Sequence, residues 1–464
     1  MDARPYESMP TLPGALPLLG HWPEIIHDVF GFLERAAERA DVVGVRFVHQ
    51  RAVITHDPAM IQHVLQQSPR LYTKSRNYAG MKKVVGEGLL TSEGEFWKRQ
   101  RKLAQPAFHH AKLRGITRTM VSATEDMLAR WRTWEDGQPF DLHEEMMRVT
   151  LRIAGLSLFG ADLDGDAREI GSALGVILPW VNGIIQDPFR PPLWVPTREN
   201  RALREALATL DRLVYRIVEE RRRNDPEHTR DDLLSMLMGA VDEGGGRMTD
   251  RQLRDEILTA VLAGHETTAN ALAWTGMLLA RHPDVGARVE REASAVLGDR
   301  SPSVDDLTKL ELCDRVVSES LRLYPPAWEF EREAIADDVA AGWRIPKGTV
   351  VMIAPWTLHR SPRFWDDPAR FDPDRFLPER SVGRPRYVYL PFGDGPRVCI
   401  GKAFAMMEAK LLLAMMAREV RFELEPGAHV RPEPSVTLRA RGGVPMRFRR
   451  VASAARFLDQ TTSA

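Results

Sequence analysis

The residues most able to do chemistry lie near the C-terminal end, where one cysteine sits in a short, rigid loop. Residues 391–401 read PFGDGPRVCIG, and Cys399 is one of only 2 cysteines among 464 residues. Directly after Gly401, apolar residues at helical spacing predict a helix over residues 402–420. A sulfur at a helix N-terminus meets free backbone N–H groups and the positive end of the dipole, which lower a thiol pKa. We therefore expect Cys399 to be a thiolate, acting as a nucleophile or a metal ligand.

Spacing alone leaves several interpretations of this cysteine open. A nucleophilic cysteine needs a histidine base, and no sequence feature nominates one. The sequence has no CxxC pair and no cysteine–histidine cluster at zinc spacing. A lone thiolate suits haem iron, for which one axial protein ligand is enough. The alternative is a buried structural cysteine in a Gly/Pro turn. Cys313 is expected to be buried and inert.

A second candidate site lies in the middle of a long predicted helix, residues 249–283. Thr249 and Gln252 form a capping-box signal at its start, and Pro283 ends it. About 30 residues at 1.5 Å each span roughly 45 Å, enough to cross a domain. Its centre, AGHETT (residues 263–268), combines glycine with threonines, which weaken a helix. We expect a site there, although the Thr267 hydroxyl could simply bond to the carbonyl four residues earlier.

Composition predicts one folded domain, mainly α with small β-sheets, over residues 1–464. Strands are expected near residues 43–56 and 348–356, where β-branched residues follow turn signals. The formal net charge is zero, so nothing global argues for nucleic acid or an acidic membrane. The proline-rich segment 1–23 lacks a long apolar run, which predicts no membrane anchor. Without a disulfide framework, we expect a cytoplasmic protein.

Taken together, these stretches resemble the cytochrome P-450 family. The loop fits its haem-binding pattern FxxGxRxCxG through Phe392, Gly395, Arg397, Cys399 and Gly401. Further segments fit the family's other motifs in its order: WKRQR (97–101), AGHETT (263–268), ESLR (319–322), Glu331-Arg332, FDPDRF (371–376) and TLRARGG (437–443). The resemblance implies the family's fold, with haem b between the long central helix and the helix that follows the cysteine loop.

The resemblance assigns roles around that haem. Cys399 becomes the axial thiolate ligand, and Ala263 and Phe392 face or shield the haem, with core filling as the alternative for Phe392. Donors to the haem propionates would be Trp97, Arg101, Arg332 and Arg397. Arg332 could instead pair locally with Glu329 or Glu331. A structural charge triad is expected from Glu319, Arg322 and Arg375.

The resemblance also implies a reaction, the insertion of one oxygen atom of O2 into a lipophilic small molecule. Glu266 and Thr267 match the acid–alcohol pair that delivers protons, whereas His265 is expected to point away from the iron. This pair favours a monooxygenase that hydroxylates or epoxidises. The alternatives are a peroxygenase or isomerase on the same fold, and a non-catalytic haem-based sensor.

Substrate and partners are less constrained. The pocket is expected to include Ala263, Ala327, Trp328, Glu329, Phe330, Thr437 and Leu438, and residues 176–196 to form an apolar lid. Glu329 is expected to pair with Arg332 or to meet a basic substrate. Fatty acids, terpenoids and steroids all fit. We expect a monomer that receives electrons from a ferredoxin or flavodoxin with its NAD(P)H-dependent reductase, docked on a basic face: Lys98, Arg99, Arg101, Lys102, Arg397, Lys402 and Lys410.

Overall fold

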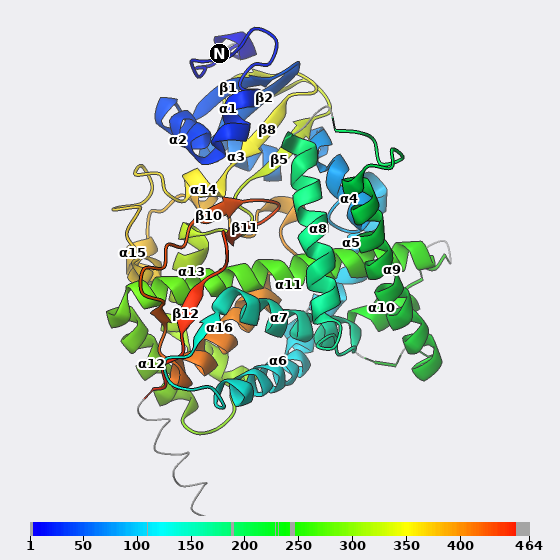
Figure 1. Cartoon of the computed structure of the whole chain (residues 1–464). Helices are drawn as coiled ribbons and strands as arrows, with labels where there is room; N and C mark the ends of the chain where they lie inside the picture. Colours follow the sequence, from blue (N-terminus) through cyan, green and yellow to red (C-terminus); the bar gives the residue numbers. More distant parts are fainter. Residues whose placement is uncertain are drawn as a thin grey trace, which may run out of the picture.

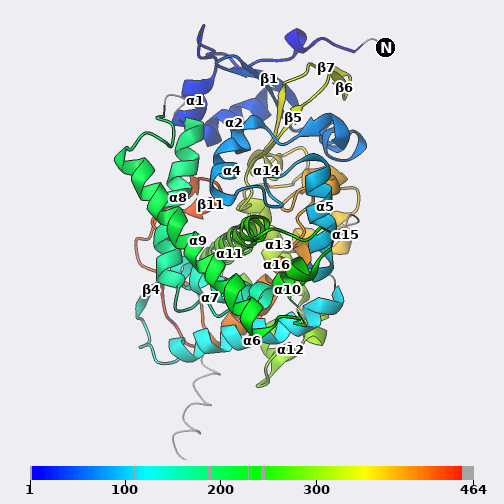
Figure 2. The same ribbon diagram turned by 90° about the vertical axis from the view of Figure 1, so that its right-hand side faces the viewer.

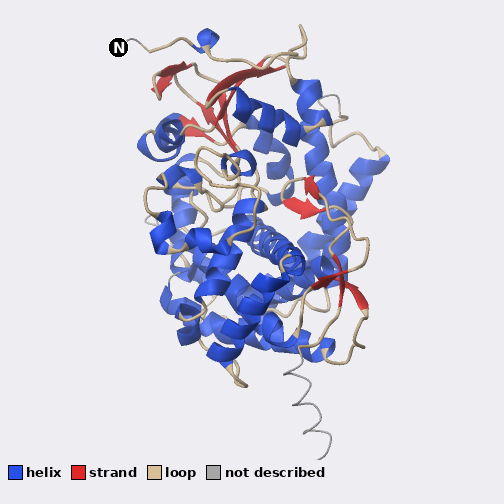
Figure 3. Ribbon diagram, turned by 90° about the vertical axis from the view of Figure 1, so that its left-hand side faces the viewer, coloured by secondary structure: helices blue, strands red, loops and turns tan. Residues whose placement is uncertain are grey.

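The computed structural model describes residues 3–108, 110–186, 190–227, 229–230, 232–241 and 246–451. Helices form most of the molecule, and the strands β1, β2, β5 and β8 lie together at the end that also holds the N-terminus (Figure 1). Figure 3 shows further strands as small patches beside the helices. The prediction of a mainly α protein with small sheets is confirmed.

The α-helices vary from one turn to nine turns in length. Those in the first half are α1 (Trp22–His27), α2 (Val29–Arg39), α3 (Pro58–Gln62), α4 (Ala79–Val85), α5 (Gly94–Ala104), α6 (His110–Trp131), α7 (Leu142–Phe159), α8 (Ala167–Gln186), α9 (Arg198–Asn224) and α10 (Leu233–Gly239). Those in the second half are α11 (Asp250–Arg281), α12 (Pro283–Leu297), α13 (Glu311–Leu323), α14 (Pro355–Leu358), α15 (Pro378–Ser381) and α16 (Lys402–Glu419).

In the part of the chain that the structure describes, the strands form four small sheets. The largest has the order β1-β2-β8-β5-β3, with β2 and β8 parallel and the other pairs antiparallel. The strand bounds are β1 (Val42–Phe47), β2 (Gln50–Thr55), β3 (Tyr72–Thr73), β4 (Pro139–Asp141), β5 (Phe330–Ala334), β6 (Asp338–Ala340), β7 (Trp343–Ile345), β8 (Val350–Ile353), β9 (Glu423–Leu424), β10 (Pro432–Pro434), β11 (Leu438–Ala440) and β12 (Pro445–Arg447). The strands expected near 43–56 and 348–356 are β1, β2 and β8. Strand β8 stops before Pro355, which occupies the first turn of α14.

Helix α11 crosses the whole molecule, horizontally in Figure 1 and nearly end-on in Figure 2. Its capping box forms as expected, because the Gln252 side chain accepts from the Thr249 backbone N–H at 2.8 Å and the Thr249 hydroxyl accepts from the Gln252 N–H at 3.3 Å. The helix ends at Arg281, just before Pro283 starts α12. It packs against α7, α13 and α16, so its middle lies in the core.

The proline-rich N-terminal segment lies against the large sheet. The Tyr6 hydroxyl donates to the carbonyls of Val45 and Ala52, each at 3.0 Å, and Met9 and Leu12 are buried. Among the described residues, no helix is both long and apolar enough to cross a bilayer.

Two carboxylates of α11 hold the segment after α4. Asp255 accepts from the Glu87 N–H at 2.9 Å, and Glu256 accepts from the Leu89 N–H at 3.1 Å. Gly86 has φ +68°, and a Cβ there would lie 2.1 Å from the Asp255 carboxyl, so only glycine allows this approach. Burial raises the pKa of Glu256 to about 7, although the Leu89 N–H acts in the opposite direction.

This pKa makes the stability of the fold depend on pH. A carboxyl whose pKa rises on folding stabilises the fold fully below its unfolded pKa, near 4.5, and this contribution is lost as pH rises through about 7. Glu256→Gln keeps an acceptor without a charge. We expect the variant to be more stable than the parent at pH 8, by about 3 kcal/mol in the free energy of unfolding from urea titration, and equal to it near pH 4.5. The exposed Glu227→Gln is the control, and a Glu256→Gln difference that stays constant with pH would contradict the assignment.

Candidate active site

The cysteine loop is fixed by backbone contacts that join distant parts of the chain. The Cys399 N–H donates to the Phe392 carbonyl at 3.0 Å, and Gly401 caps α16. Gly395 has φ +72°, and a Cβ there would lie 1.9 Å from the carbonyl oxygen of Leu65. The loop therefore needs glycine at 395, because the segment after α3 lies directly against it.

The Cys399 side chain remains accessible inside this loop. Burial raises the pKa of the Cys399 thiol, whereas the Gly401 N–H, Arg101 and Lys402 lower it by less. The thiol of this structure therefore lacks the lowered pKa that the helix terminus was expected to give, because burial acts more strongly than the Gly401 N–H and the two cations. A bound cation would supply the charge that keeps the sulfur ionised.

The second cysteine and the other possible metal ligands offer no competing site. Cys313 in α13 has no exposed surface, and burial raises the pKa of its thiol well above the usual value. Within the described ranges, no group of three or more His, Cys, Asp and Glu side chains could hold a metal ion. The accessible lone sulfur of Cys399 thus fits an iron that needs one axial protein ligand.

One face of central α11 is open although its neighbours are buried. Ala263 is exposed and Thr267, one turn further along the same face, is half-buried, whereas His265, Glu266 and Thr268 are buried. The Thr267 hydroxyl donates to the Ala263 carbonyl at 2.6 Å. The Thr267 hydroxyl therefore makes the bond to the carbonyl four residues earlier that the sequence analysis gave as the alternative to a catalytic role. The hydroxyl oxygen still has lone-pair capacity for a water, so the catalytic role of Thr267 stays a prediction.

The other polar side chains of this turn are buried. The Glu266 carboxyl accepts from the Thr437 hydroxyl at 2.5 Å. Burial raises the pKa of Glu266, while Thr437 and then Arg439 lower it by less. His265 lies against α7, where its carbonyl accepts from Thr150 at 3.1 Å, and burial lowers its pKa to about 4.

A group of partly buried cations, here called the cation cluster, surrounds the cysteine loop: Lys74, Arg101, Arg332 and Arg397. Arg101 donates to the Val398 carbonyl at 2.9 Å, and Arg332 donates to the Glu331 carbonyl at 2.8 Å. Arg397 pairs with Glu93, and its guanidinium lies 3.8 Å from the centre of the Trp97 ring.

The cations of the cation cluster repel one another. Burial first, with repulsion between the cations, lowers the pKa of Arg397 to about 10 and that of Lys74 well below its usual value. Glu93 is the carboxylate in contact with Arg397. Partly buried cations that repel one another match an anionic ligand such as a pair of carboxylates. Sequence reasoning missed Lys74, which belongs to no motif and meets Arg332 and Arg397 only through the fold.

Glu319, Arg322 and Arg375 meet in a fully buried ion pair network. Arg322 donates to both Glu319 oxygens, at 2.7 and 2.8 Å, and Arg375 donates at 3.2 Å. Arg322 also donates to the carbonyls of His359 and Pro368, each at 2.8 Å. The network thus ties α13 to the loop that leads toward Cys399.

Comparison with known proteins agrees with this geometry. The family model described as Cytochrome P450 matches residues 10–443. Cyclooctatin synthase from Streptomyces melanosporofaciens is 37% identical over 92% of this chain and 93% of its own length. Pentalenene oxygenase from Streptomyces avermitilis is 35% identical over 92% of this chain and 94% of its own length. The crystal structure of the cytochrome P450DA heme domain matches with a TM-score of 0.85 at 26% identity, covering 97% of this chain and 99% of that chain.

This chain belongs to the cytochrome P450 family. It is a P450 monooxygenase, an oxidoreductase whose cofactor is haem with the iron bound by a cysteine thiolate. Of its two cysteines, Cys399 is the accessible one. The cation cluster has the charge that would hold the haem propionates, and the exposed Ala263 of α11 would border the haem.

The predicted pocket residues of this P450 fall into two groups. Ala327 is exposed, and Glu329 and Phe330 are partly exposed. Leu438 has no exposed surface and Thr437 is bonded to Glu266, so these two do not lie on an open wall as expected. The Trp328 indole donates to the Ser435 carbonyl at 2.8 Å, which joins this segment to the β10–β11 hairpin.

Glu329 has an unusual environment. One of its carboxyl oxygens is buried without a hydrogen-bond partner, and burial, then Glu331, raises the pKa of Glu329 well above the usual value, while Arg332 lowers it. The ion pairs of the described residues do not include Glu329 with Arg332, so the expected pair is not formed in this structure.

Of the lid expected over 176–196, residues 187–189 lie outside the described residues; residues 176–186 form the end of α8.

The basic face is smaller than expected. Arg101 and Arg397 turn inward, and Lys410 pairs with Asp314 at 3.0 Å. Lys98, Lys102 and Lys402 are exposed.

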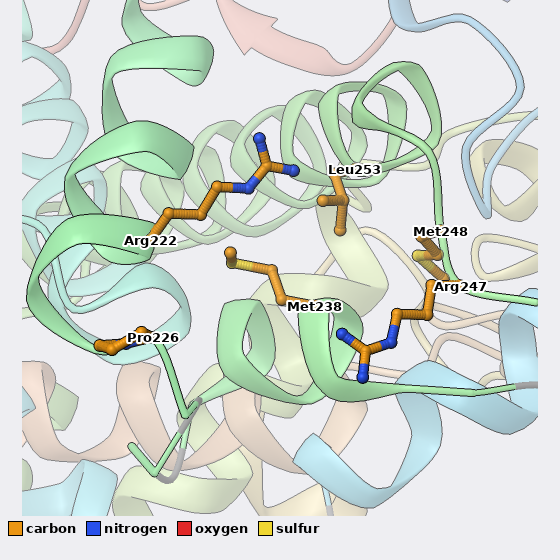
Figure 4. Close-up of a pocket in the computed structure, with 6 residues that line it drawn as sticks. All are labelled: Arg222, Pro226, Met238, Arg247, Met248 and Leu253. Carbon is orange, nitrogen blue, oxygen red and sulfur yellow. The ribbon is translucent and has the colours of Figure 1, made fainter.

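Away from this region, α9, α10 and the start of α11 enclose a separate pocket of about 200 Å³, into which Arg222 and Arg247 reach from opposite sides (Figure 4). It includes none of the predicted site residues, and Arg222 already pairs with Asp250 at 2.5 Å.

Arg322→Leu should destabilise the P450 strongly, because it leaves Glu319 and Arg375 buried without their shared partner. We expect a loss of about 3–5 kcal/mol in the free energy of unfolding, measured by urea titration, together with poor haem retention. Lys98→Ala is the control, since it breaks only the exposed pair with Glu95 and should change stability by about 1 kcal/mol or less. Equal effects of the two variants would contradict the structural role of the network.

Lys74→Met should act in opposite directions on the two forms of the protein. Without haem, removing one cation of the cation cluster relieves repulsion, so the apoprotein should unfold at higher urea concentration. With haem, the lost donor should speed transfer of haem to an excess of apomyoglobin. Lys83→Met, an exposed lysine of α4, is the control. A Lys74→Met variant that loses haem no faster than this control would exclude Lys74 from the haem site.

Proposed function

We propose that this P450 hydroxylates or epoxidises a lipophilic small molecule, with a terpenoid as the first candidate, and that Glu266 and Thr267 deliver the protons. The observation that carries the proton role is the arrangement on α11: Thr267 shares the open face with Ala263, and the Glu266 carboxyl is buried directly behind it. Relatives named for cyclooctatin and pentalenene, both terpenoids, support the substrate class. A fatty acid or a steroid-like molecule is the next candidate.

Each residue of the proposed site has a role that follows from its position. Bound haem supplies the iron at which dioxygen is reduced. Thr267 can hold a water on the open face while its proton stays on the Ala263 carbonyl, and Glu266 supplies a carboxyl whose pKa burial raises, which favours its protonated form. We infer that an acidic ferredoxin, or a flavodoxin, docks near the exposed Lys98, Lys102 and Lys402 and brings electrons from an NAD(P)H-dependent reductase. We propose a cytoplasmic monomer.

The spectrum of the reduced, carbon-monoxide-bound protein tests the iron ligand. We expect the red-shifted Soret band of thiolate ligation, and its loss in Cys399→Ser at equal haem content. Cys313→Ser is the control and should keep the band. A parent band at the position of histidine-ligated haem would support the alternative of a haem-based sensor.

Thr267→Ala tests the proton role. We expect hydrogen peroxide per NADPH consumed to rise, with product formation falling about tenfold or more, because the open face no longer holds a water. The control is Thr268→Ala, which removes the neighbouring hydroxyl on the buried side. Unchanged coupling in Thr267→Ala would contradict the role and favour a peroxygenase or isomerase.

A spin-state screen of terpenoid hydrocarbons against fatty acids and steroids tests the substrate class.

A further inference from the structure

A chain of hydrogen bonds runs from the start of α7 through α11 to the hairpin and ends on Glu266. His143 Nε2 lies 3.0 Å from Asn270 Oδ1, Asn270 Nδ2 donates to the Thr437 hydroxyl at 3.1 Å, and Thr437 donates to Glu266 Oε1 at 2.5 Å. Asn270 is 0% exposed, Glu266 4% and Thr437 8%. The final contacts are therefore shielded from water, where a hydrogen bond is strongest.

Each bond in this chain points the same way. The Asn270 amide gives its N–H to Thr437, so its oxygen is the end that faces His143, and His143 must donate from Nε2. The single proton of the Thr437 hydroxyl is directed to Glu266. Aligned donors polarise one another, so the whole chain stabilises negative charge on one oxygen of the Glu266 carboxyl.

Charged groups lie near both ends of this chain of hydrogen bonds. His143 is half-buried and faces Asp141, Glu144, Arg439 and His265. Glu266 faces Thr437 and Arg439, and Arg439 is itself paired with Glu433 at 2.8 Å. The hairpin thus brings to Glu266 a neutral donor in contact and a cation that is already balanced by a carboxylate.

We propose that Thr437, Asn270 and His143 are positioning residues for proton delivery: they fix Oε1 of Glu266 on the hairpin, so that the other oxygen, Oε2, carries the proton for the open face of α11. This inference rests on the proposed role of Glu266 and extends it to three residues outside the acid–alcohol pair. An amide relays protons poorly, so the chain orients and stabilises the carboxylate and does not itself transfer the proton.

Thr437→Val removes the donor at nearly constant shape, and Thr437→Ser keeps the hydroxyl. The haem-loaded protein is supplied with electrons by a plant-type ferredoxin and its NADPH-dependent reductase, without substrate, and peroxide per NADPH is measured from pH 6 to pH 9. We expect Thr437→Val to raise the peroxide fraction at least twofold and Thr437→Ser to match the parent. Because Thr437 lowers the pKa of Glu266, the midpoint of the pH profile should move to higher pH in Thr437→Val. A purely structural effect would lower coupling at every pH without moving the midpoint.

Glu266→Gln and the double variant Glu266→Gln/Thr437→Val separate this inference from the proposed function. If Thr437 acts through Glu266, the double variant should equal Glu266→Gln alone. A changed Glu266→Gln with an unchanged Thr437→Val would overturn the inference and leave the role of Glu266 intact. An unchanged Glu266→Gln would overturn both. If Thr437→Val fails to retain haem, Asn270→Leu interrupts the same chain one step earlier, and a parent-like profile for it would also overturn the inference.

Discussion

The buried carboxylate of Glu319 is the interaction on which the cysteine side of the molecule depends. Two arginines satisfy it from different elements, and the backbone N–H of Asp372 donates to the same carboxylate at 2.9 Å. Arg322 and Arg375 then use their remaining donors on carbonyls of residues 359–370. These bonds hold a loop between α14 and the cysteine loop against α13.

The cation cluster and the Glu319 network differ in their balance of charge. This difference explains why the Glu319 network is structural, whereas the cation cluster is suited to a ligand. In the Glu319 network every donor finds a carbonyl or carboxylate of the chain itself. Around Cys399, Lys74 is repelled by Arg332 and Arg397, and Glu93 is the carboxylate paired with Arg397. Repulsion between partly buried cations is unfavourable, so the fold holds this region at a cost of stability that an anionic ligand offsets. Haem with its two propionates has the chemistry to do so.

Much of this arrangement could be predicted from the sequence, because the chemistry demands fixed residue types at fixed spacing. The cysteine loop, the capping box at Thr249 and the ExxR pair are local patterns of this kind. Lys74, His143 and Asn270 could not be found in that way, since each acquires its role from residues more than 100 positions away. The pKa of Cys399 was predicted in the wrong direction for a related reason: the helix dipole is local, whereas burial depends on the packing of the whole chain. Leu438 follows a family pattern in sequence, yet its side chain turns into the core.

The close approach of Gly395 to the Leu65 carbonyl has a consequence for biosynthesis. These residues are separated by almost three quarters of the chain, so the floor of the cysteine loop is made long before the loop itself. At about 5–20 residues per second, the ribosome would need on the order of half a minute to supply the second partner. The segment around Leu65 therefore waits for its partner while the intervening residues, including strands β5 and β8 of the large sheet, are made. Haem can be bound through Cys399 only after the cysteine loop has emerged and packed against Leu65.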